Sequence, residues 1–114
     1  MAVLRLGALP AAALAAAAEF HADLVPKVRD RLAGKPSCLT LVFAPADHTH
    51  RAWRLAAIQS LAREFAPARV NALVSDNEKA IAAALAYLES AQGVTGQLLE
   101  LDDTGAGEVL SFRS

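Results

Sequence analysis

Residues 38–43 read Cys-Leu-Thr-Leu-Val-Phe, a nearly continuous apolar run that decides the fold class. A strand buried on both faces has this pattern, and such strands occur in parallel sheets with helices on each side. A short turn at residues 44–47 follows, and either Asp47 or Thr49 is expected to cap the helix after it. That helix should carry an apolar stripe at spacings of three and four residues, made of Leu55, Ile58, Ala62 and Phe65.

A similar unit precedes this one. Residues 3–7 predict a short strand, and residues 11–32 predict an Ala-rich helix. Pro26 should kink or split that helix because proline lacks the backbone N–H and clashes with the preceding turn. Gly34 and Pro36 are expected to end it.

The C-terminal half of the chain repeats the pattern. Strands are predicted over residues 69–74 and 97–101, and the tail contains a candidate fifth strand at residues 109–112. Ser75 and Glu78 have the spacing of a capping box, with Ser75 at the cap. The buried face of the helix that follows is expected to contain Ile81, Leu85 and Leu88.

The predicted order is β-α-β-α-β-α-β in a single domain over residues 1–114. Strands that alternate with helices in this way favour an α/β fold built on a parallel sheet with crossover helices. We therefore expect a four-stranded parallel sheet and three main helices.

Composition and charge exclude several classes of function. The formal net charge is -1 and the chain has no basic run, so it lacks the electrostatic footprint of a nucleic-acid-binding protein. No segment approaches the ~20 uninterrupted apolar residues of a membrane span. Pro10 and Glu19 argue against a signal peptide in the Ala-rich N-terminal segment. Cys38 is the only cysteine, which excludes an internal disulfide and fits a cytoplasmic location.

Two parts of the chain resemble the short-chain dehydrogenase/reductase family. Residues 60–67 and 69–74 (Ser-Leu-Ala-Arg-Glu-Phe-Ala-Pro, then Arg-Val-Asn-Ala-Leu-Val) are similar to a passage from helix to strand in that family. Residues 86–91 and 94–102 (Ala-Tyr-Leu-Glu-Ser-Ala, then Val-Thr-Gly-Gln-Leu-Leu-Glu-Leu-Asp) are similar to its last helix and last strand. The resemblance implies a partial Rossmann-like, three-layer domain that corresponds to the C-terminal half of a dehydrogenase.

The same resemblance implies that the family's chemistry is missing. The family binds NAD(P) through a glycine-rich turn after its first strand, and neither G-x-x-x-G-x-G nor G-x-G-x-x-G occurs here. The alignment places Asp47 where the family has its catalytic Tyr, and Arg51 where it has the Lys four residues later. An ionised Asp has no proton to donate, and Arg is a poor replacement for that Lys. The catalytic Ser has no equivalent in residues 44–46, so we expect neither catalysis nor a bound cofactor.

Polar side chains at two predicted strand ends are the candidate ligand-binding residues. In open α/β sheets, ligands bind beyond the carboxyl ends of the strands. Six residues at these ends are candidates for a small polar or metal site: Asp47, His48, His50, Arg51, Ser75 and Asp76. His21 is a further candidate metal ligand.

Each candidate also has a purely structural interpretation. Asp47 would cap a helix while both nearby histidines face solvent, and the capping box would account for Ser75 and Asp76. Arg51, Trp53 and Arg54 could form an anion-binding or cation–π group. Alternatively, Trp53 packs at an interface and the two arginines lie in water. Cys38 is expected to be a core residue.

Three functions remain open at this point. The leading one is a non-catalytic interaction or regulatory module, dimeric, or assembled with a full-length dehydrogenase relative through the helices that such enzymes use to dimerise. The second is a small-ligand-binding protein or minor enzyme that uses residues 47–50 and 75–77. The third is a protein that still binds a nucleotide.

Overall fold

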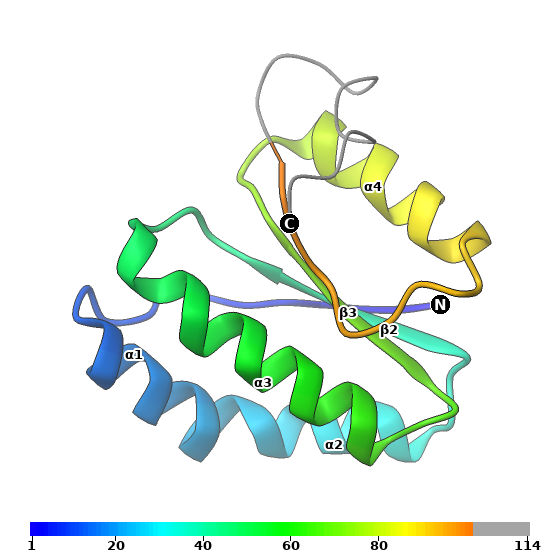
Figure 1. The fold of residues 1–114 in the computed structure, drawn as a ribbon, viewed down its shortest axis with the longest axis horizontal. Helices are drawn as coiled ribbons and strands as arrows, with labels where there is room; N and C mark the ends of the chain where they lie inside the picture. The colour runs from blue at the N-terminus through cyan, green and yellow to red at the C-terminus, as the bar shows by residue number, and fades with distance from the viewer. Residues whose placement is uncertain (102–114) are drawn as a thin grey trace.

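The computed structural model of the chain describes residues 1–101 and contains a four-stranded, fully parallel sheet in the order β1-β2-β3-β4 (Figure 1). The strands are β1 (Ala2–Arg5), β2 (Cys38–Phe43), β3 (Arg69–Val74) and β4 (Leu98–Glu100). Strands β2 and β3 pair along their whole length, from Cys38 opposite Arg69 to Phe43 opposite Val74. The predicted α/β fold class is confirmed, although β1 and β4 are shorter than predicted. The candidate strand at residues 109–112 lies outside the described residues.

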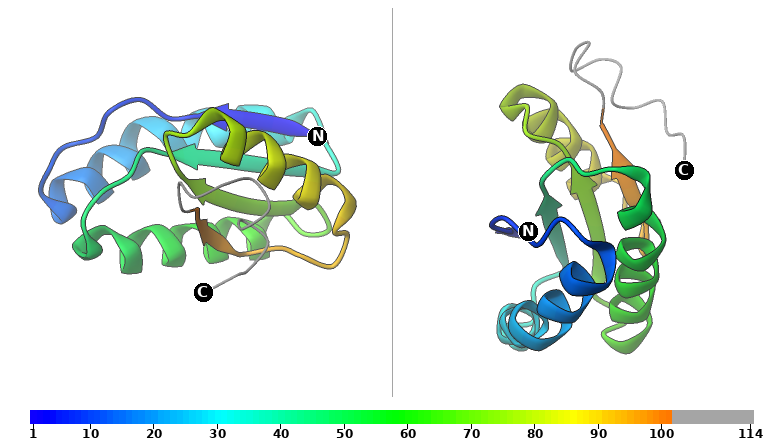
Figure 2. Two further views of the ribbon diagram at one scale, coloured as in Figure 1. Left: turned by 90° about the horizontal axis from the view of Figure 1, so that it is seen from above. Right: turned by 90° about the vertical axis from the view of Figure 1, so that its left-hand side faces the viewer.

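Helices cover both faces of the sheet. One face is covered by α1 (Ala13–Glu19), α2 (Val25–Ala33) and α3 (Arg51–Glu64), and the other by α4 (Glu78–Ser90) (Figure 2). Successive strands are neighbours throughout, so the chain steps across the sheet in one direction. The β3-α4-β4 crossover, with its helix on the opposite face, therefore has the opposite hand to the other two.

The first predicted helix is interrupted, as Pro26 indicated. A five-residue π-helical segment (Phe20–Leu24) separates α1 from α2, and Pro26 lies in the first turn of α2. A missing N–H is tolerated there because the first helical N–H groups have no partner within the helix. The end of α2 agrees with the prediction, because the helix ends at Ala33 with Gly34 as its C-cap. Gly34 is right-handed, and the left-handed residue is Lys35, with a φ of 56°.

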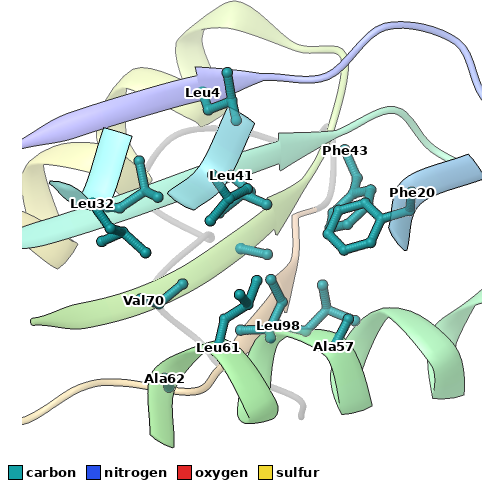
Figure 3. Close-up of a cluster of buried hydrophobic side chains, with 14 of the residues drawn as sticks. Leu4, Phe20, Leu32, Leu41, Phe43, Ala57, Leu61, Ala62, Val70 and Leu98 are labelled. Carbon is teal, nitrogen blue, oxygen red and sulfur yellow. The ribbon is translucent and has the colours of Figure 1, made fainter. Parts of the chain in front are cut away.

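Two layers of apolar side chains hold the sheet between its helices. Alternate residues of β2 point to opposite faces, so Leu41 packs toward α1–α3 and Val42 toward α4. Figure 3 shows strand side chains such as Val70 and Leu98 facing Leu61 of α3. The buried stripe of α3 differs from the predicted one, because two of the four residues predicted to be buried are only half-buried. Its buried residues are Arg54, Ala57, Ile58, Leu61 and Ala62, while Leu55 and Phe65 are the half-buried pair.

On the other face, α4 buries Ile81 and Leu88 as expected, while Leu85 is half-buried.

Across residues 1–101, no helix combines the length and the apolar character needed to cross a bilayer.

Candidate functional site

A cavity of about 340 Å³ lies beyond the carboxyl ends of β1 and β2. Its walls are residues 7–11 of the loop after β1 and residues 44–47 of the loop after β2. Phe43, His50 and Arg54 complete the lining. The sheet brings these segments together because parallel strands end at the same edge, which is the usual ligand side of such sheets.

Asp47 lies at the cavity wall and caps the short 3₁₀ helix (His48–His50) that leads into α3. Its carboxylate accepts a hydrogen bond of 3.0 Å from the backbone N–H of Thr49 and another from the Thr49 hydroxyl. These hydrogen bonds, the one from the hydroxyl above all, hold the pKa of Asp47 below its ordinary value. The predicted capping role is confirmed, and it makes Asp47 an acceptor rather than a proton donor.

His50 is buried, contrary to the structural interpretation in which both histidines face solvent. Its Nδ1 accepts a hydrogen bond of 3.2 Å from Trp53 Nε1, which is a donor only. Its Nε2 lies 2.9 Å from the carbonyl oxygen of Ala11, an acceptor only. The two partners together assign the neutral Nε2–H tautomer. His48 is exposed, so only one of the two histidines lines the cavity.

The two neighbouring arginines have different environments. Arg51 is partly exposed and pairs with Glu100 at the end of β4, with 3.3 Å between Nε and Oε1. Arg54 is only 5% exposed, which corrects the expectation that both arginines lie in water. Its Nη1 donates to the carbonyl oxygen of Ala44 at 3.0 Å. Burial lowers the pKa of the Arg54 guanidinium, and attraction to Glu100 partly offsets this.

Aromatic rings pack around these polar groups. The Arg54 guanidinium lies 4.5 Å from the centroid of the Phe43 ring, a cation–π distance. Phe20 packs against Phe43 and Trp53, with ring centroids 5.7 and 5.4 Å away. Trp53 therefore packs within this chain, in an aromatic cluster at the cavity's edge.

The turn after β3 does not contribute to this cavity, so the structure does not bring the two candidate clusters into one pocket. The N-cap of α4 is Asn77, whose side chain accepts a hydrogen bond of 3.0 Å from Ala80 N. The prediction of Ser75 as the cap is therefore wrong. Ser75 is buried and its Oγ accepts from Asn77 N at 2.9 Å, while Asp76 is exposed.

The predicted capping box fails because Glu78 has another partner. Its carboxylate forms a two-point pair with the guanidinium of Arg5, at 2.9 and 3.0 Å. The backbone N–H of Ser75, which Glu78 would accept from in a capping box, donates to the carbonyl oxygen of Phe43 instead.

The candidate metal ligands are not assembled. Among residues 1–101, no group of three or more His, Cys, Asp or Glu side chains is placed to hold a metal ion. His21 is exposed, and its Nδ1 lies 2.7 Å from the carbonyl oxygen of Ala17. Cys38 is buried in the sheet, as expected for a core residue.

Arg54 is the cavity residue whose position the sequence argument missed. A usable signal was present, because Arg54 lies four residues before Ile58 and eight before Ala62, on the predicted buried stripe. An arginine at that spacing interrupts the apolar stripe. A polar side chain at such a position is expected to be buried and to need hydrogen-bond partners.

A family profile described as "Short chain dehydrogenase-like protein" matches residues 4–101. A search of curated proteins and a search of solved structures each found no significant match.

Proposed function

Since this chain belongs to the short-chain dehydrogenase-like family, we propose that it is a non-catalytic member that acts by association, as a homodimer or with an intact dehydrogenase relative. One observation supports this most strongly. The two positions that the resemblance aligns with the family's Tyr and Lys have structural contacts instead: Asp47 caps a helix and Arg51 pairs with Glu100.

The proposal follows from what each group can do. The Asp47 carboxylate is held ionised by its hydrogen bonds to Thr49, so it has no proton to give to a carbonyl oxygen at neutral pH. Arg51 is directed toward Glu100, so its charge is neutralised within the chain. Neither group offers the proton transfer that reduction of a carbonyl requires.

Helix α1 is the surface that we assign to association. Leu14 is 88% exposed, and the neighbouring exposed residues Ala15 and Ala18 add small apolar side chains. Small side chains allow a second helix to approach closely. A partner helix on this face would bury the leucine, which favours association by removing apolar surface from water.

The catalytic part of this proposal is tested with the family's cofactors. Thermal denaturation of the full chain is recorded with and without millimolar NADH, NADPH or AMP, beside an active short-chain dehydrogenase as the positive control. We expect no change in the midpoint for this chain, because ligands stabilise only the proteins that bind them. A concentration-dependent rise with either reduced cofactor would contradict the proposal and favour a nucleotide-binding protein.

A second candidate function is binding of a small ligand in the cavity beyond β1 and β2. The specific observation in its favour is that His50 faces this cavity rather than bulk solvent, in a hollow of about 340 Å³. Cavities of this size, with mainly apolar walls and a few polar groups, are typical of ligand sites.

A further inference from the structure

Arg54 brings a positive charge into the interior without a matching negative one. It is 5% exposed, and none of the three ion pairs formed within residues 1–101 includes it. Buried charges in proteins are normally paired, because an unpaired charge loses its hydration without compensation. Within residues 1–101, Arg54 therefore has no carboxylate in direct contact; the attraction that it feels comes from Glu100, which is paired with Arg51.

The hydrogen bonds of Arg54 are also incomplete. A guanidinium has five N–H donors, and the contact recorded for Arg54 is the single bond from Nη1 to the carbonyl oxygen of Ala44. Its Nε is buried and has no hydrogen-bond partner. The Phe43 ring below the guanidinium and the Ala44 carbonyl fix its plane. The Nε–Nη2 edge therefore has no hydrogen-bond acceptor among residues 1–101.

The cavity that Arg54 lines suits an anion with an apolar body. Leu9, Pro10, Phe43 and Pro45 supply apolar wall. Arg54 and Asp47 are the charged residues of the lining, and their charges are opposite. Arg54 can pair with one negative charge of a ligand, whereas the second charge of a dianion such as a phosphate monoester would find no further cation in the lining.

We propose that this cavity binds a small organic monocarboxylate, whose carboxylate group pairs with Arg54 and whose apolar part contacts the loops after β1 and β2. Carboxylates are well matched to arginine because they accept two parallel N–H hydrogen bonds. The inference rests on the second candidate function, ligand binding in this cavity, and is independent of association through α1.

The test uses benzoate as the probe and benzamide as its neutral counterpart of similar shape. Each is titrated into the full chain, and backbone amide resonances are followed by NMR. Benzoate is expected to shift the resonances of residues 7–11 and 44–47 in a saturable way. Benzamide should bind at least about tenfold more weakly, because it lacks the charge-assisted hydrogen bonds.

Three variants locate the effect. Arg54→Gln should weaken benzoate binding at least about tenfold, and Arg63→Gln, at an exposed arginine of the same helix, should leave it unchanged. Ala46→Leu narrows the cavity without removing a charge and should block both probes. If Arg54→Gln fails to fold, the preference for benzoate over benzamide and the block by Ala46→Leu decide the question.

The outcomes distinguish two claims: that the cavity binds a ligand, and that Arg54 pairs with an anionic group of that ligand. Equal binding of benzoate and benzamide at this site would overturn the assignment of an anion to Arg54 while leaving the cavity a ligand site. An equal loss of benzoate binding in Arg63→Gln would also overturn it, since the effect would then be one of general charge. No saturable shift with either probe would overturn both this inference and the second candidate function.

Discussion

His50 connects two separate parts of the chain through one imidazole ring. It accepts from Trp53 on α3 and donates to the carbonyl oxygen of Ala11, in the loop that leads to α1. Both ring nitrogens therefore have partners, and the ring closes one wall of the cavity. A buried polar group of this kind stabilises a particular arrangement of its neighbours, because removal of the group leaves each of its hydrogen-bond partners unsatisfied.

The two histidines at this turn provide a matched comparison. His50→Ala should lower the free energy of unfolding by about 2 kcal/mol or more, since Trp53 Nε1 and the Ala11 carbonyl oxygen lose their partners. His48→Ala, at an exposed position, should change it by less than about 0.5 kcal/mol. Urea denaturation followed by circular dichroism measures both values. Equal effects of the two substitutions would show that the network around His50 contributes nothing.

Among the secondary-structure elements, the start of α4 depends on two side chains that accept hydrogen bonds from backbone N–H groups. Ser75 accepts from Asn77, and Asn77 accepts from Ala80 as the N-cap. The strand β3 ends at Val74, so these two side chains set the direction in which the chain leaves the sheet. That direction places α4 on the face opposite the other helices (Figure 2).

Asn77→Ala is expected to lower the free energy of unfolding by about 1 kcal/mol, because it removes the acceptor for the first turn of α4. Asn77→Asp should retain most of the stability, since aspartate accepts the same hydrogen bond and is favoured at a helix N-terminus. Thermal and urea denaturation of both variants provide the measurement. A wild-type midpoint in Asn77→Ala would mean that Ser75 caps the helix after all.

The sequence predicted the strands best where a long apolar run is bounded by polar residues or proline. The bounds of β2 and β3 agree with the prediction. Residues 38–43 are a nearly continuous apolar run, and residues 69–74, which include Asn71, lie between Pro67 and the polar turn at residues 75–78. The cap of α4 was misassigned because Ser75 and Asn77 are both good capping residues. What distinguishes them is that Glu78 pairs with Arg5 and not with the backbone N–H of Ser75. The sequence alone offers no information about that partner.

The site was predictable in part. Asp47 was found because a strand end followed by an acidic residue and a helix has a local signature. The burial of Arg54 depends on Phe43 and the Ala44 carbonyl, which come from β2 and the loop after it. Contacts between elements of this kind follow from the packing of α3 on the sheet. The spacing of Arg54 places it on the buried stripe, but the groups that surround its guanidinium became apparent only in three dimensions.

At the scale of the whole molecule, the chain retains the parallel sheet and helices of a short-chain dehydrogenase-like protein while its strand-end residues have structural contacts. Asp47, Arg51 and His50 each have hydrogen-bond or ionic partners within the chain. The exposed face of α1, whose largest apolar side chain is Leu14, is an apolar surface that these contacts do not explain. We infer that the function of the chain depends on this face rather than on turnover at the strand ends.

The molar mass of the full chain in solution, measured by light scattering at high micromolar concentration, tests homodimerisation through α1. We expect the mass of a homodimer, which is twice the 11.9 kDa of a single chain. Leu14→Glu should reduce the mass to that of one chain, whereas Ala82→Glu, at an exposed position of α4 across the sheet, should not. A wild-type mass of 11.9 kDa under these conditions would contradict homodimerisation through α1.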